Sequence, residues 1–203
     1  MLCGVTADSG RLTEDAEPEL RLVLCALDES LAAAWNGIAE DRAGITVHRG
    51  SVLDVVVDAA VSPANSYGWM RGGVDAIYAR AFPDVEQQVR SAVLAYHGGE
   101  LPVGEALLVP TGTPTPRWLI SAPTMREPGE HLPADTVHPY LAARAMFRLW
   151  FGGALDNGTP VRRVVRSIAL PGLGTGIGGA DPALCARQVA AAWDEVFAGA
   201  DRV

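Results

Sequence analysis

Two side chains that could act on a bound ligand flank a short glycine-rich segment. Asn65 follows an apolar run, and Asp75 comes ten residues later, after the pair Gly72-Gly73. An amide donates and accepts hydrogen bonds, and a carboxylate can orient or activate water as a general base. Each residue alone also fits a local role, Asn65 in a turn and Asp75 at the positive end of a helix. Because the glycines between them allow a ligand to approach the backbone closely, the two residues together indicate a ligand site.

A second glycine-rich segment reads LPGLGTGIGG over 170–179. From Gly174 to Gly179 it matches the pattern G-x-G-x-x-G between a predicted strand and a predicted helix. A nicotinamide-binding fold needs a further strand after that helix, and the sequence contains none there, which disfavours a Rossmann oxidoreductase. The backbone N–H groups of such a segment can bind a phosphate. The alternative explanation is a sharp turn that needs positive φ angles.

The charge pattern limits how an anionic ligand can be held. The formal net charge is −8, and all 16 basic residues are arginine. Without lysine there is no P-loop lysine and no Schiff-base lysine, so backbone N–H groups, helix N-termini or arginines must bind the anion. The acidic balance also disfavours general nucleic-acid binding, which depends on releasing counterions from phosphates.

The remaining composition favours a cytoplasmic protein without a cofactor or a metal. Cys3, Cys25 and Cys185 are too scattered for a disulfide framework or a zinc site, and Cys185 fits a small buried apolar residue. No histidine is paired with cysteine or acid at the spacing of metal ligands. The N-terminal stretch lacks the features of a signal peptide, and no apolar run is long enough to span a bilayer.

Apolar periodicity predicts an α/β domain whose loops gather at one end of a mainly parallel sheet. We expect one domain over 21–203, preceded by a polar extension over 1–20 for which disorder is an option. The predicted strands are 21–28, 44–51, 55–63, 106–110, 117–122 and 164–171. The predicted helices are 29–40, 74–82, 85–97, 136–151 and one that starts at Pro182 with Asp181 as its N-cap.

Both glycine-rich segments resemble those of the macrodomain family. VDAAVSPANSYGWMRGGVD over 57–75 is similar to its first ligand loop, and ALPGLGTGIGG over 169–179 is similar to its second. LPVGEALLVPTG and APTMREPG between them resemble a bacterial and phage branch. The resemblance covers about 21–198. It implies a three-layer α/β/α sandwich with a mixed, mostly parallel sheet and a cleft for ADP-ribose.

The resemblance also implies a role for each site residue. Asn65 would bind the distal ribose, and Asp75 would orient or activate water beside it. The N–H groups of 174–178 would cradle the diphosphate. The residues implied to contact the ligand, besides Asn65 and Asp75, are Ser51, Val52, Ala64, Gly72, Gly73, Val74, Gly174, Thr175, Gly176, Ile177 and Gly178.

Three departures from the family pattern affect the function. Ser51 stands where the family's aspartate accepts a hydrogen bond from adenine, so a neutral hydrogen bond replaces a charge-assisted one. In the altered first loop, Arg71 would either pair with the diphosphate or remain solvated. Gly178 stands where an aromatic residue often contacts the distal ribose, and Tyr67 or Trp69 would supply that wall or else belong to the core.

The resulting expectation is a protein that binds ADP-ribose and hydrolyses an ADP-ribosyl ester or ADP-ribose 1''-phosphate. A module that reads ADP-ribose without turnover is the alternative, because the groups that bind the distal ribose also position water. A regulatory partner that uses the cleft for protein contact is a third option, which no sequence feature supports.

Overall fold

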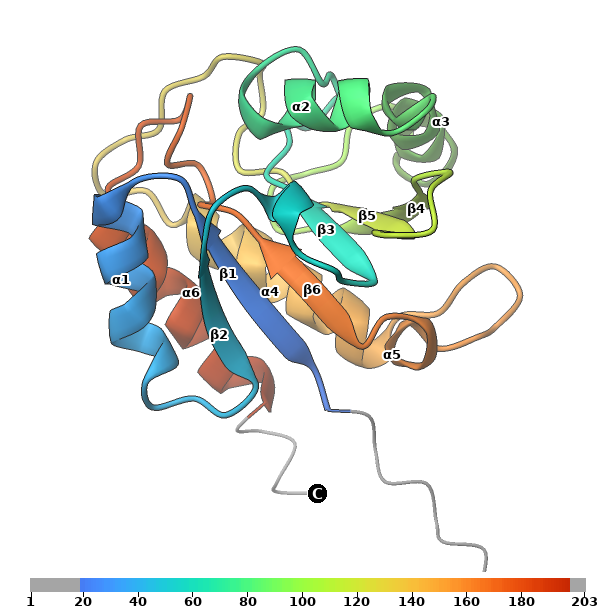
Figure 1. Ribbon diagram of the computed structural model, residues 1–203. Helices are drawn as coiled ribbons and strands as arrows, with labels where there is room; N and C mark the ends of the chain where they lie inside the picture. The colour runs from blue at the N-terminus through green and yellow to red at the C-terminus, as the bar shows by residue number, and fades with distance from the viewer. Residues whose placement is uncertain (1–18, 198–203) are drawn as a thin grey trace, which may run out of the picture.

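The computed structural model describes residues 19–197 and contains a six-stranded sheet (Figure 1). Residues 1–18 of the predicted extension and residues 198–203 lie outside the described part. The order of the strands is β2-β1-β6-β3-β5-β4, and every neighbouring pair is parallel except β4 and β5. The strands are β1 (Arg21–Ala26), β2 (Ile45–Arg49), β3 (Ala59–Ser62), β4 (Leu107–Pro110), β5 (Trp118–Ser121) and β6 (Ser167–Leu170).

Helices cover both faces of this sheet, which gives the three layers that the sequence predicted (Figure 1). On one face pack α1 (Glu29–Ala39), α4 (His138–Gly152) and α6 (Pro182–Phe197), and on the other α2 (Gly73–Ala81) and α3 (Val85–His97). A short helix α5 (Val161–Val164) precedes β6, and a 3-10 turn η1 (Val52–Asp54) follows β2. No helix within 19–197 is long and apolar enough to cross a membrane.

The alternation of apolar residues along the strands divides the core between the two faces. In β1, Leu22 and Leu24 belong to the cluster that contains Trp35 of α1, whereas Val23 and Cys25 belong to the cluster under α2 and α3. Successive strand residues point to opposite faces, so one β-strand contributes to both cores. Burying each large apolar side chain stabilises the fold by about 1.5–3 kcal/mol. Two-sided burial is therefore what makes the strand sequences almost continuously apolar.

Aspartate side chains cap two helix starts, and the one at Asp181 was predicted from the sequence. Asp28 accepts a hydrogen bond from the N–H of Leu31 at 2.9 Å and caps α1. Asp181 accepts one from the N–H of Leu184 at 2.8 Å at the start of α6. Cys185 in α6 is fully buried, as expected for a small apolar residue.

The predicted central strand over 55–63 is only partly correct, because β3 occupies Ala59–Ser62 alone. Val56, in the middle of the β-branched run, is 76% exposed. The reason lies at Asp58, whose Oδ2 accepts hydrogen bonds from the N–H of Arg166 and from the N–H and hydroxyl of Ser167, all at 2.8–2.9 Å. Asp58 thus joins the start of β3 to the start of β6, and the chain before it is outside the sheet.

Replacing Asp58 by alanine is expected to lower the free energy of unfolding by about 2–4 kcal/mol, since several hydrogen bonds to a charged group are lost. Urea denaturation measures this change. Asp135→Ala is the matched control, because Asp135 is exposed and its side chain makes no hydrogen bond to another residue of 19–197. Equal stability of the two variants would show that Asp58 does not hold the two strands together.

Candidate functional site

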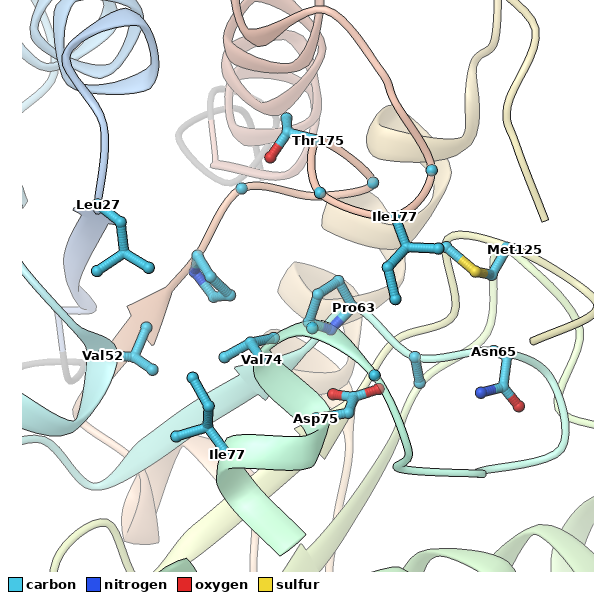
Figure 2. A pocket seen from close by; sticks show the side chains of 18 of the residues that line it. Leu27, Val52, Pro63, Asn65, Val74, Asp75, Ile77, Met125, Thr175 and Ile177 are labelled. Carbon is cyan, nitrogen blue, oxygen red and sulfur yellow. The ribbon is translucent and has the colours of Figure 1, made fainter. Parts of the chain in front are cut away.

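A cavity of about 1050 Å³ lies at the carboxyl ends of β1, β6, β3 and β2. Parallel strands all end at the same edge of their sheet, and open α/β sheets bind ligands outside that edge. Figure 2 shows Leu27, Val52, Val74 and Ile77 gathered at one end of the cavity and Asn65 and Met125 at the other. The cavity therefore has an apolar end and an end formed by the loop after β3.

The second glycine-rich loop follows β6 and presents a row of backbone N–H groups without a partner. Within residues 19–197, none of the five N–H groups of 174–178 donates a hydrogen bond to another protein atom. All five residues line the cavity. Unpaired N–H groups in a row form a concave site for an anion, and such groups need a partner when a ligand excludes water.

The protein itself requires most of the glycines in this loop. Gly174 has φ +69°, a left-handed conformation, and a Cβ at Gly178 would lie 2.6 Å from the carbonyl oxygen of Gly174. Gly176 differs, because a Cβ there would have no protein atom within 4 Å. Neither packing nor a left-handed backbone explains the glycine at this position. A group that approaches the loop from the cavity would explain it.

Ile177 connects the two glycine-rich loops across the cavity. A Cβ at Gly72 would lie 2.6 Å from Cδ1 of Ile177, so the isoleucine rests against the backbone of the first loop. Figure 2 shows its side chain reaching down from the second loop, between the apolar end and the end that holds Asn65. Ile177 is still 42% exposed. The cavity is thus spanned by one side chain near its middle.

Asn65 organises the first loop through its own side chain. Its Nδ2 donates to the carbonyl oxygen of Trp69 at 2.7 Å, and its Oδ1 accepts from the N–H groups of Tyr67 and Trp69 at 3.2 Å. These bonds tie Trp69 to the start of the loop. The guanidinium groups of Arg71 and Arg90 lie 4.3 Å and 3.5 Å from the centre of the Trp69 ring. Cation–π contacts of this kind keep a guanidinium group beside an indole ring.

Asp75 lies in the first turn of α2 and is buried, with 7% of its surface exposed. Asp75 shares the buried side of its helix with Tyr78, which apolar periodicity alone does not indicate. Asp75 and Tyr78 are the buried residues of α2, whereas Val74 and Ile77 are only partly buried and line the cavity. Val74 and Ile77 thus form part of the cavity wall, and the carboxylate of Asp75 lies between this wall and Ser62 at the end of β3.

The carboxylate of Asp75 has one oxygen bound and one available. Oδ1 accepts a hydrogen bond from the hydroxyl of Ser62 at 2.6 Å. Within the described residues Oδ2 has no hydrogen-bond partner, and Asp75 lines the cavity. Burial raises the pKa of Asp75 from 3.8 to about 6, and the hydrogen bond from Ser62 opposes this rise. A carboxylate with a pKa near neutrality is suited to accept a proton from water.

Ser51 lies at the apolar end of the cavity and caps the turn η1. Its Oγ accepts a hydrogen bond from the N–H of Leu53 at 3.2 Å, and Oδ2 of Asp54 accepts one from the N–H of Ser51 at 2.8 Å. The Asp54 carboxylate is therefore used within the turn itself. The polar side chain that this turn presents to the cavity is a neutral hydroxyl.

Nearly all the predicted site residues line the same cavity. The exception is Tyr67, which does not line it; its hydroxyl donates to Glu127 at 3.2 Å, and Arg126 lies 5.8 Å from its ring centre. Trp69 and Arg71 do line the cavity. The predicted residues that line it are Ser51, Val52, Ala64, Asn65, Trp69, Arg71, Gly72, Gly73, Val74, Asp75, Gly174, Thr175, Gly176, Ile177 and Gly178.

Two groups of the lining residues that sequence reasoning missed lie outside the glycine-rich segments. The first group lies at the end of β1 and consists of Cys25, Leu27 and Asp28. Because β1 pairs with β6, its end lies beside the second glycine-rich loop, and that pairing would have indicated these residues. Met125 and Gly129 come from the irregular chain after β5, where no periodic pattern gives a signal. Burial raises the pKa of the Cys25 thiol to about 12, which keeps it protonated. In the described part of the chain, no three His, Cys, Asp or Glu side chains gather as they would around a metal ion.

Comparisons with known proteins identify similar chains and folds. The family model described as Macro domain matches residues 61–189. A protein of Aeropyrum pernix is 35% identical over 150 residues, which cover 73% of this chain and 69% of that protein. A protein of Aquifex aeolicus is 34% identical over 145 residues, which cover 71% of this chain and 78% of that protein.

Solved macrodomains have the same fold. The macrodomain of Thermus aquaticus DarG matches with a TM-score of 0.56 and 26% identity, over 73% of this chain and 89% of that chain. The Trypanosoma brucei macrodomain in complex with ADP-ribose matches with a TM-score of 0.51 and 22% identity, over 73% and 56% of the two chains. At 22% identity the second match shows the fold alone.

Replacing Asp75 by asparagine is expected to stabilise the protein near neutral pH and to change little at about pH 4. The folded-state pKa of about 6 lies above the ordinary value of 3.8. The stability that Asp75 contributes is thus fully present below about pH 4 and is lost as the pH rises through about 6. A difference of two pKa units corresponds to at most about 3 kcal/mol at neutral pH.

Urea denaturation of both proteins across this pH range measures the difference in the free energy of unfolding. A difference that does not change with pH would contradict a raised pKa of Asp75.

Proposed function

Because the chain belongs to the macrodomain family, we propose that its cavity binds ADP-ribose and hydrolyses the bond between the distal ribose and its leaving group. The substrate is an ADP-ribosyl ester or ADP-ribose 1''-phosphate. The Trypanosoma brucei macrodomain in complex with ADP-ribose supports the choice of ligand. The observation that carries the proposal is the row of unpaired N–H groups over 174–178, beside a buried carboxylate at the same cavity.

The diphosphate would lie on the second glycine-rich loop. Five N–H groups without a protein partner supply donors for its oxygens, and the chain has no lysine to bind it otherwise. Arg71 lines the cavity and rests on the ring of Trp69. Because it forms no ion pair within the described residues, its positive charge is available to the diphosphate. The bare backbone at Gly176 leaves room for the phosphates to approach.

The adenine base of ADP-ribose would lie at the apolar end of the cavity. Val52, Val74 and Ile77 supply an apolar surface there, and Leu27, which is 74% exposed, extends it. A flat base ring gains from removing such surface from water. Ser51 offers its edge a hydroxyl, and a neutral hydrogen bond contributes only about 0.5–1.5 kcal/mol. We infer that the base contributes less to affinity than the diphosphate does.

The distal ribose would lie between the first loop and Asp75, which acts as the general base. Oδ2 of Asp75 accepts a proton from a water molecule that attacks the anomeric carbon, and the leaving group departs as a carboxylate or as phosphate. Asp75 then gives its proton to solvent. The raised pKa, about 6, supports this role, because proton transfer is most effective when the base titrates near the working pH. Asn65 would donate the second hydrogen of its Nδ2 to the distal ribose. It would also hold Trp69 in place as a wall of the ribose site.

A module that reads ADP-ribose without turnover is the second candidate, and the bonds of Asn65 favour it. Both polar atoms of that side chain already bind the backbone of their own loop. A side chain used in this way shapes the site more than it acts on a substrate. Binding and turnover therefore need separate tests.

Replacing Gly176 by valine is expected to weaken ADP-ribose binding at least 100-fold while the protein keeps its thermal midpoint. No protein atom lies within 4 Å of the added Cβ, so the fold accepts the side chain, whereas the diphosphate would meet it. Isothermal titration calorimetry measures the binding. Gly37→Val is the matched control, because Gly37 is an exposed residue of α1 with the same open surroundings. Unchanged affinity of the folded Gly176→Val protein would remove this loop from the diphosphate site.

Replacing Asp75 by asparagine is expected to lower kcat about 10²–10⁴-fold, the usual contribution of a general base. The Kd for ADP-ribose should change far less, since an amide still hydrogen-bonds a ribose hydroxyl. Release of ADP-ribose from a peptide modified on glutamate, and of phosphate from ADP-ribose 1''-phosphate, measures turnover, with Asp135→Asn as the control. A wild-type protein that binds ADP-ribose firmly and releases nothing from either substrate would exclude hydrolysis and establish the reading module.

A further inference from the structure

A hydrogen bond joins Ser62, which lies outside the cavity, to Asp75, which lines it. Ser62 is the last residue of β3 and is 1% exposed. Its hydroxyl donates to Oδ1 of Asp75 at 2.6 Å, and within residues 19–197 this is the one side-chain hydrogen bond that the carboxylate receives. Ser62 does not line the cavity. Any influence of Ser62 on a ligand must therefore act through Asp75.

Ser62 and Asp75 belong to elements that are held in different ways. β3 lies inside the sheet, paired with β5 on one side and β6 on the other. α2 begins at Gly73, directly after the first loop, and no side chain caps its N-terminus. Asp75 is in the first turn of this helix. The hydroxyl of Ser62 thus ties the carboxylate to a strand that is paired on both sides.

We propose that Ser62 is the positioning residue of this site: its hydroxyl holds Oδ1 of Asp75 against the end of β3 and so leaves Oδ2 as the oxygen that faces the cavity. This inference rests on the proposed hydrolysis, because the orientation of one oxygen matters most when that oxygen accepts a proton from water. Side chains that hold a catalytic group in one rotamer maintain the geometry on which the rate depends.

The surroundings of Asp75 make Ser62 the group that controls its acidity as well. The neighbouring titratable groups are Tyr78 on the same helix and, beyond it, Cys25 on β1. Burial raises the pKa of Tyr78 well above 10 and that of Cys25 to about 12, so both are uncharged near neutral pH. The hydroxyl of Tyr78 donates to the carbonyl oxygen of Val61 instead of to Asp75. No basic side chain in the described chain lowers the pKa of Asp75, and the hydroxyl of Ser62 alone opposes the effect of burial.

Replacing Ser62 by alanine tests this role with two measurements. Carbon NMR of the Asp75 carboxyl group follows its titration without any need for turnover, and the pH profile of kcat/KM follows its use as a base. We expect both midpoints to rise by about one pH unit, because a hydrogen bond to the charged form is lost. We also expect kcat to fall about tenfold or more near pH 6, while the Kd for ADP-ribose changes less than threefold.

Ser121 provides the matched control. It pairs with Ser62 in the parallel register of β3 and β5, is fully buried, and its hydroxyl has no hydrogen-bond partner within 19–197. Ser121→Ala removes the same group from the neighbouring strand and should leave both midpoints unchanged. Ser62→Thr keeps the hydroxyl and should restore the wild-type titration. If Ser62→Ala fails to fold, Ser62→Cys preserves the volume with a weaker donor and should show the same upward shift.

The outcomes separate this inference from the proposed function. An unchanged Asp75 titration in a folded Ser62 variant, or an equal shift in Ser121→Ala, would overturn the positioning role even if hydrolysis is found. If Ser62→Ala shifts the titration of Asp75 while the wild-type protein binds ADP-ribose but releases nothing, the positioning role of Ser62 stands and hydrolysis is rejected.

Discussion

The parallel alignment of β1, β6 and β3 is the constraint on which the rest of the site depends. Because these strands run in one direction, the chain leaves each of them at the same edge of the sheet. The loop that could hold an anion leaves β6, and the loop before Asp75 leaves β3. Asp58 stabilises this arrangement at the opposite end of the strands, where it binds the start of β6. The starts of β3 and β6 are thus held together by Asp58, whereas the loops after their carboxyl ends line the cavity.

The site combines backbone N–H donors with one buried carboxylate, and the donors can hold an anion without lowering the pKa of that carboxylate. An acidic chain without lysine can hold a phosphate on N–H groups, which carry no side-chain charge that would pair with Asp75. Had a lysine been present beside Asp75, it would lower the pKa of the carboxylate and weaken it as a base. Burial next to an uncharged serine gives the opposite result.

The sequence predicted the elements and the membership of the site better than it predicted orientations. Strand alternation and the glycine patterns are local signals that indicated the elements and the two loops, whereas the resemblance to the macrodomain family named the fifteen residues that line the cavity. The burial of Asp75 had no signal in the sequence, because apolar periodicity cannot distinguish an apolar cavity wall from an apolar core. The short β3 was missed because Val55, Val56 and Val57 have strand-like side chains, while the bonds of Asp58 to a distant strand decide where pairing begins. The bonds inside the first loop depend on its three-dimensional course and have no periodic signature.

The side chain of Ile177 across the cavity has a consequence for ligand exchange. A ligand that occupies both ends must pass a single exposed isoleucine that rests on the backbone at Gly72. Rotation of an exposed side chain takes picoseconds to nanoseconds, far less than a domain movement. Entry and departure would therefore proceed without a slow opening step. The residence time would then depend on how many contacts the occupant makes with the cavity walls.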